Sequence, residues 1–229
     1  MKRILVPTTG PADWQRLLAK PDRQWRDGYS AKELAKRWEK AGGIPAEIAE
    51  LFSGSGVPAF RNLDPIAAFP EWQTDLEGKG EASHSDVFVI ARATDGLITI
   101  TVEGKVAEPF GPTVSEWLDK STEGKDGNRR DRLAFLCRTL SLGEDAVRSL
   151  RYQLLHRTAS AVIEAKRFGA PYAAMVVHSF SPSHEWLSDY QEFVRRFGTE
   201  AEPGRLVELG ETSGVRLYTG WARGEADGA

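Results

Sequence analysis

The sequence predicts an α/β or α+β layered domain, with a mixed central sheet that contains an antiparallel hairpin and is flanked by helices. Two apolar, β-branched segments at 87–91 and 97–102 are separated by an Asp-Gly turn, which is typical of a hairpin. Segments with helical spacing precede and follow this hairpin. A further apolar segment at 172–180 follows the longest helical pattern, so the chain returns to the sheet.

The length of 229 residues suits one large domain or two small ones, and a chain of this size can bury about 70–75% of its unfolded surface. No linker is long or polar enough to mark a boundary. We therefore expect a single domain over 1–229 with a core at about 30–180. A helical N-terminal extension is expected at about 1–60. A C-terminal helix plus strands are expected at about 183–223.

Helices are expected where apolar residues recur at 3.6-residue spacing next to capping residues. Ser30 is the expected N-cap of the second helix, with Glu33 completing a capping box. Ser183 is the expected cap of the last helix. The expected helical segments are 11–20, 31–40, 45–52, 113–118, 129–142, 144–168 and 183–197. The remaining expected strands are 71–76, 205–210 and 214–224.

Charge and cysteine content restrict the class of protein. The net charge of −3 argues against a general nucleic-acid coat protein. Residues 1–40 carry ten Lys/Arg against five Asp/Glu, so this end can approach a polyanion, although solvated helix faces are the interpretation we favour. Cys137 is the only cysteine, and no run of about 18 apolar residues occurs. The apolar stretch at the N-terminus is too short for a signal peptide. We expect a soluble cytoplasmic protein that does not contact a membrane.

The ends of the hairpin carry a candidate site. Pairing of Ala91 with Ile98 would place Asp86 opposite Glu103, and Lys105 would project from the same face of the strand as Glu103. Facing residues lie about 4.5–5.5 Å apart, where two carboxylates repel unless a positive charge lies between them. A metal ion is one candidate for that charge, and Lys105 is the other.

A hard divalent cation suits this set of residues. Mg²⁺ (or Mn²⁺) prefers one or two carboxylates plus waters and substrate phosphates. Asp86 and Glu103 are the candidate metal ligands, and Gly104 would add its exposed backbone carbonyl. Lys105 would orient a water or stabilise charge on a phosphate. The pattern is coherent with phosphodiester hydrolysis.

The segment SDVFVIARATDGLITITVEGK resembles the core of the PD-(D/E)XK, or restriction-endonuclease-like, nuclease superfamily. That core has a helix, three antiparallel strands with Asp on the second and (Asp/Glu)-x-Lys on the third, a second helix and a further strand. The resemblance covers about residues 30–180 and departs from the usual pattern in having Ser85, not Pro, before Asp86.

The resemblance implies a Mg²⁺-dependent nuclease acting on DNA, with Asp86, Glu103 and Lys105 as catalytic residues. It also implies supporting residues on the two helices. An additional acid on the first helix corresponds to Glu39, and polar residues on the second helix correspond to Gln153, His156 and Arg157.

The whole chain is similar to an uncharacterised bacterial family through SAKELAKRWE, VEGKVAEPFGPTVSEW, RYQLLHRTASA and VHSF. That similarity implies no activity.

Other interpretations stay open. Glu-Gly-Lys occurs three times in the chain, so the tripeptide alone is weak evidence, and a surface ion pair is the plain alternative. A non-catalytic nucleic-acid or protein binding module on the same fold is the alternative function, and a homo-oligomer formed through the C-terminal strands is a third. The cluster Arg129, Arg130, Arg132 and Arg138 can meet phosphate or form a solvated face. His178 and Cys137 are expected in the core.

Overall fold

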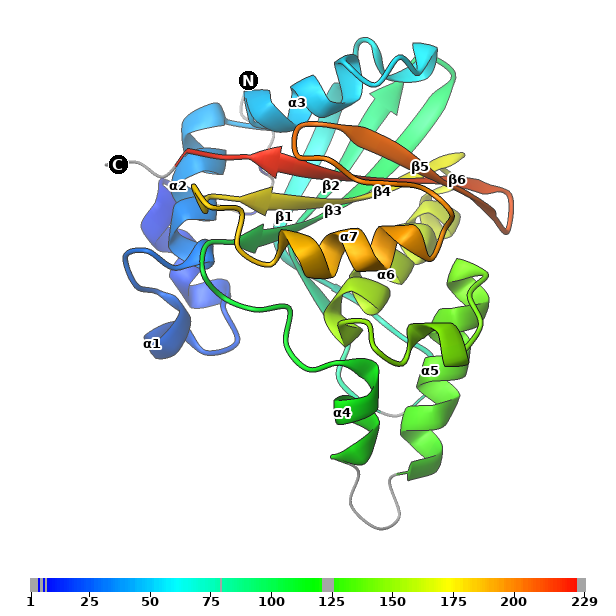
Figure 1. The fold of residues 1–229 in the computed structure, drawn as a ribbon. Helices are drawn as coiled ribbons and strands as arrows, with labels where there is room; N and C mark the ends of the chain where they lie inside the picture. Colours follow the sequence, from blue (N-terminus) through cyan, green and yellow to red (C-terminus); the bar gives the residue numbers. More distant parts are fainter. Residues whose placement is uncertain (1–3, 5, 7, 79, 121–125, 226–229) are drawn as a thin grey trace.

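A six-stranded mixed sheet forms the centre of the computed structural model, which describes residues 4, 6, 8–78, 80–120 and 126–225 (Figure 1). The strand order is β1-β2-β3-β4-β6-β5. The strands are β1 (Asp64–Thr74), β2 (Ser83–Ala93), β3 (Gly96–Lys105), β4 (Tyr172–Ser179), β5 (Leu206–Thr212) and β6 (Val215–Arg223). The pairs β1–β2, β2–β3 and β5–β6 are antiparallel, and β4 runs parallel to both β3 and β6. The C-terminal strands therefore belong to the central sheet.

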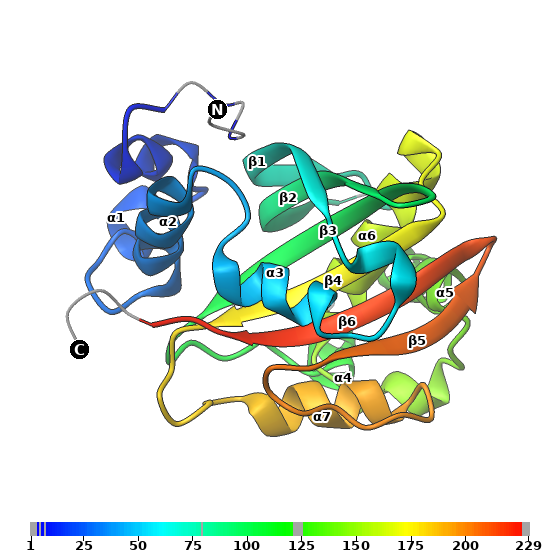
Figure 2. The same ribbon diagram turned by 90° about the horizontal axis from the view of Figure 1, so that it is seen from above.

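Helices cover both faces of the sheet (Figure 2). They are α1 (Pro21–Gln24), α2 (Ser30–Ala41), α3 (Ala46–Ser53), α4 (Val114–Asp119), α5 (Asp126–Leu140), α6 (Tyr152–Phe168) and α7 (Leu187–Arg195). Short 3₁₀ helices occur at Pro11–Leu17, Pro58–Phe60 and Asp145–Val147. A mixed sheet flanked by helices confirms the predicted α+β layering. None of the helices in the described part of the chain has the length and apolar character needed to cross a membrane.

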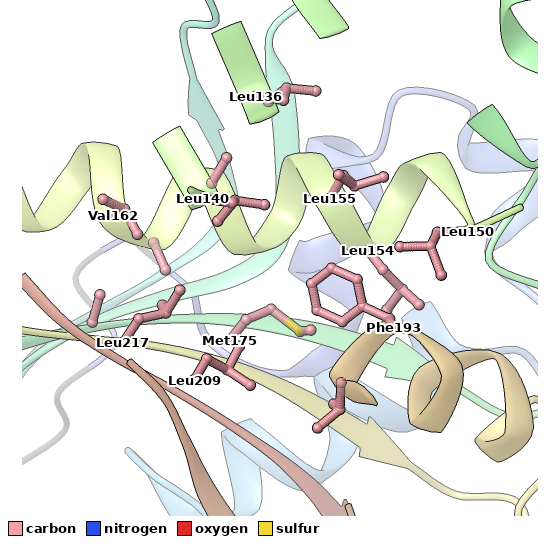
Figure 3. Close-up of a cluster of buried hydrophobic side chains, with 14 of the residues drawn as sticks. Leu136, Leu140, Leu150, Leu154, Leu155, Val162, Met175, Phe193, Leu209 and Leu217 are labelled. Carbon is pink, nitrogen blue, oxygen red and sulfur yellow. The ribbon is translucent and has the colours of Figure 1, made fainter. Parts of the chain in front are cut away.

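The central strand β4 separates two hydrophobic cores. All eight of its residues are buried, and successive side chains point to opposite faces. Ala174 and Val176 pack in the cluster that includes α2 and α3. Met175 and Val177 pack in the cluster that includes α5, α6 and α7, shown in Figure 3. This two-sided burial explains why the strand is almost continuously apolar.

Strand β3 presents apolar residues to one face and threonines to the other, and the threonines bind α6. The hydroxyl of Thr99 donates to the carbonyl of Ala161 at 2.9 Å, and that of Thr101 donates to the carbonyl of Arg157 at 3.0 Å. Four helical residues advance about 6 Å, and two strand residues advance about 6.6 Å, so the two repeats match. One step further along, α6 therefore places polar side chains over Glu103.

The predicted hairpin register is confirmed. Ala91 pairs with Ile98, and the last pair on the side of the site is Val87 with Val102. Asp86 consequently lies opposite Glu103, one residue beyond that pair.

At the N-terminal side one expected cap is wrong and one predicted strand has other bounds. Ser30 is the first residue of α2, and Tyr29 is the N-cap without a side-chain bond. The amide and hydroxyl of Ser30 instead donate to Glu108. The predicted strand 71–76 runs over Asp64–Thr74. Because β1 is an edge strand, it tolerates its two prolines.

Two other predicted helices begin later than expected. The carbonyls of Arg148 and Leu150 accept from the amides of Ser115 and Val114, so α6 begins at Tyr152 and not at residue 144. The last helix begins at Leu187 without the predicted Ser183 cap. Lys79 and the Glu-Gly-Lys copy at 123–125 lie outside the described residues.

Candidate active site

Glu103 is a buried carboxylate held by three donors. Its Oε1 accepts from Lys105 Nζ and from Gln153 Nε2, each at 2.7 Å, and its Oε2 accepts from Arg157 Nε at 2.6 Å. Its side chain is 4% exposed. Burial alone raises the pKa of Glu103, but Lys105 and Arg157 outweigh burial and hold the pKa below its usual range. Glu103 is therefore ionised at neutral pH.

Asp86 is bound to the backbone of the neighbouring strand. Its Oδ2 accepts from the amide of Gly104 at 2.7 Å. Burial, followed by the charge of Glu103, raises the pKa of Asp86 to about 7. Among the described residues no donor bonds to its second oxygen, which leaves that oxygen available to a ligand.

Glu71 is a third acid that sequence reasoning missed. It lies between the β1–β2 pairs Pro70–Val87 and Trp72–Ser85, and therefore opposite Asp86. Its φ of 52° is unusual for a residue with a side chain, and such strain concentrates at functional sites. Burial, followed by the charge of Asp86, raises the pKa of Glu71 to about 9. Its carboxyl group makes no hydrogen bond within the described part of the chain.

The remaining polar residues of α6 lie beside this acid cluster. His156 Nδ1 is 2.9 Å from the hydroxyl of Ser83, and Arg157 Nη1 donates to the same hydroxyl at 3.0 Å. Burial and the charge of Arg157 lower the pKa of His156 well below its usual value, so the imidazole is neutral at neutral pH. The three helical residues predicted to support the site, including Gln153, thus all reach β2 or β3.

Gly104 contributes differently from the expectation of an exposed carbonyl. The residue is buried, and a Cβ there would lie 3.2–3.3 Å from Leu34, Asp86 and Ser30. Glycine therefore allows α2 to pack closely against β3 while its amide donates to Asp86. In the structure Gly104 therefore acts as a hydrogen-bond donor to Asp86.

Glu39 does not join the cluster. The N-terminal end of α2 packs on Gly104 through Ser30, and Glu39 lies nine residues further, about 13 Å along the helix axis. Its Oε1 accepts from Thr8 Oγ1 at 2.6 Å and from Trp14 Nε1 at 2.8 Å. These contacts place Glu39 against the N-terminal segment.

A cavity of about 810 Å³ opens beside the acids. Its lining includes Glu71, Asp86, Ser83, His84, Trp117, Arg129, Arg132, Tyr152, His156 and Arg157. Glu103 and Lys105 are 3% and 4% exposed and do not line it. A ligand in the cavity would therefore meet Asp86 and Glu71 first.

The cavity acids fit a hard cation as a two-carboxylate site. Mg²⁺ is commonly held by one or two carboxylates, with waters and substrate phosphate completing its shell. Glu71 and the second oxygen of Asp86 supply two such groups. No set of three or more His, Cys, Asp and Glu side chains in the described ranges is placed to hold a metal. Glu103 already accepts three of the about four hydrogen bonds that a carboxylate can take.

Two residues expected in the core are buried there. His178 is fully buried, and its Nε2 lies 2.8 Å from Glu47 Oε1. Cys137 is buried in the core, and burial raises the pKa of its thiol to about 11, which makes it a poor nucleophile.

Sequence reasoning missed Glu71 because two prolines obscured strand β1. It missed Ser83, whose hydroxyl contacts His156 and Arg157, because a lone serine carries no pattern. The signal for Glu71 was the edge-strand position, where proline is permitted.

The comparisons with known proteins add one match. The model of the family described as "Domain of unknown function (DUF6946)" matches residues 7–226. No curated protein and no solved structure matches the chain.

Replacing Glu103 with Gln should lower the free energy of unfolding by about 3–5 kcal/mol, because Lys105 and Arg157 would stay buried without a counter-charge. Urea unfolding measures the change. The matched control is Glu192→Gln, which breaks exposed pairs with Arg195 and Arg196 and should cost less than about 1 kcal/mol. Equal, small costs for both variants would contradict the account of Glu103.

Asp86→Asn should change how stability depends on pH. The folded-state pKa of about 7 lies above the ordinary value of 3.8, so between these values folded Asp86 keeps a proton that the unfolded chain has lost. Stability then falls as pH rises over this window. Relative to wild type, the free energy of unfolding of the variant should rise by about 1.4 kcal/mol for each pH unit of that window. Parallel stability curves from pH 4.5 to 7 would refute the raised pKa.

Proposed function

The chain belongs to the family described as "Domain of unknown function (DUF6946)". From the geometry of its site, we propose that it is a metal-dependent phosphodiester hydrolase, a nuclease acting on DNA. One observation carries the proposal. Asp86 on β2, and Glu103 and Lys105 on β3, meet the polar side of α6 next to an open cavity.

The order of elements supports a restriction-endonuclease-like core. The helices α2 and α3 precede three antiparallel strands, and α6 leads into β4, which lies next to β3. Asp86 lies on the second of the three strands, and Glu103 and Lys105 lie on the third. This is the arrangement that the PD-(D/E)XK resemblance implies.

In this proposal Asp86 and Glu71 hold Mg²⁺ or Mn²⁺ at the cavity. A bound ion of this kind lowers the pKa of a water and polarises a phosphoryl oxygen. Glu103 holds Lys105 beneath the cavity and Arg157 at its lining. Lys105 would have to give up its contact with Glu103 to reach an attacking water, whereas Arg157 would face the phosphate directly.

A non-catalytic binding module on the same fold is the second candidate, favoured by a specific observation. Lys105 is 4% exposed and its ammonium group is paired with Glu103 at 2.7 Å. In a protein that only binds nucleic acid or a partner protein, this pair would stay intact and Asp86 would have no role in turnover.

Cleavage of DNA in the presence of Mg²⁺ or Mn²⁺ tests the proposal. Asp86→Asn should reduce the rate by at least about a hundredfold, because it removes a charged cation ligand. The matched control is Asp95→Asn at the turn of the same hairpin, where the exposed side chain accepts from Tyr172 and does not line the cavity. This control should cleave like wild type. Wild-type protein that binds DNA but does not cleave it would favour the second candidate.

A further inference from the structure

Arg132 on α5 is a buried cation that pairs with no carboxylate in the described part of the chain. The residue is 8% exposed and lines the cavity. Its Nη1 donates to the carbonyl of Glu81 at 2.7 Å, and its charge acts on Tyr152, which lines the same cavity. Its Nε is buried and has no hydrogen-bond partner among the described residues, none of which offers it a carboxylate. Arginine stays charged in proteins, so the site retains an unbalanced positive charge.

The surroundings of Arg132 hold it rigidly. Gly80, with a φ of 141°, lies so close that a Cβ there would be 3.1 Å from Nη2 of Arg132. Trp117 of α4 and Tyr152 of α6 stack with ring centroids 3.9 Å apart and planes at 9°. A side chain this well supported is pre-organised for a ligand, since little freedom remains to be lost on binding.

A second arginine lies on the same wall. The guanidinium of Arg129 lies 5.3 Å from the ring centroid of Trp117 and donates to the carbonyl of Trp117. Lys20 and Arg157 also line the cavity. The stacked aromatic pair thus positions two guanidinium groups, whose planar donors match the oxygens of a phosphate.

We propose that the part of the cavity around Arg132, with Arg129 beside it, is a phosphate subsite for the backbone of a nucleic acid. The counter-charge that Arg132 lacks in the protein is supplied by a phosphodiester of the substrate. This inference rests on the proposed function. The bound phosphate would belong to the same nucleic-acid strand whose neighbouring phosphodiester bond is presented to Asp86 and Glu71. The cavity volume of about 810 Å³ is sufficient for a nucleotide unit.

Calorimetric titrations without divalent metal test the subsite, with inorganic phosphate and with a four-residue oligothymidylate as probes at one fixed ionic strength. Arg132→Gln should weaken binding of both probes by about tenfold or more, the effect of losing a charge-assisted hydrogen bond. The matched control is Arg130→Gln, an exposed arginine on α5 that does not line this cavity and should bind like wild type. If Arg132→Gln does not fold by circular dichroism, Arg129→Gln replaces it with the same expectation.

The outcomes separate the possible sources of the phosphate. Competition between the two probes for one site that requires Arg132 supports the proposal. Binding of inorganic phosphate alone, equal affinities in the Arg132 and Arg130 variants, or no binding by wild type would overturn it.

Asp86→Asn distinguishes the subsite from the catalytic proposal. Its phosphate binding should be retained or strengthened, because the substitution removes a negative charge from the cavity. Probe binding that requires Arg132 in a protein without cleavage activity would reject the nuclease and keep the subsite. Cleavage that does not depend on Arg132 would reject the subsite and keep the nuclease.

Discussion

The site depends on one buried charge, the carboxylate of Glu103. Lys105, Gln153 and Arg157 all donate to it, and they come from both β3 and α6. The threonine hydroxyls of β3 bind carbonyls of α6 and keep helix and strand in step. Breaking the charge cluster would leave two buried cations unpaired, so the position of α6 over the strand ends is strongly constrained. That constraint holds one wall of the cavity in place.

Asp86 and Glu71, the two acids beside Glu103, accept fewer hydrogen bonds than Glu103 within the described part of the chain. Glu103 is compensated by cations, whereas Asp86 has a single backbone donor and Glu71 has none within the described part of the chain. Their raised pKa values express the cost of placing a second and a third negative charge at the same place. A divalent cation would remove that cost. Arg132 lines the same cavity, so under our proposals a cation and a phosphate would occupy separate positions in it.

Much of this arrangement follows from local pattern. The Asp-Gly turn fixed the register that brings Asp86 opposite Glu103, and helical spacing put Gln153 and Arg157 on one face of α6. Other features depend on contacts between distant segments, which a single sequence does not encode locally. Residues 148–152 bond to 112–115 and shorten α6, and the edge position of β1 brings Glu71 into the site. The sequence grouped Arg132 with neighbouring arginines that can form a solvated face. In the structure Arg132 is buried, and it donates to the carbonyl of Glu81 in the β1–β2 connection.

The most direct test of the account is calorimetric titration of Mg²⁺ at pH 7.5 in two buffers that differ in ionisation enthalpy. With a pKa of about 9, Glu71 is protonated at this pH and must lose its proton to hold a cation beside Asp86. The account predicts binding that releases about one proton per ion and that disappears in Asp86→Asn. Absence of binding to wild type, or binding that Asp86→Asn leaves unchanged, would contradict a cation site at these two carboxylates.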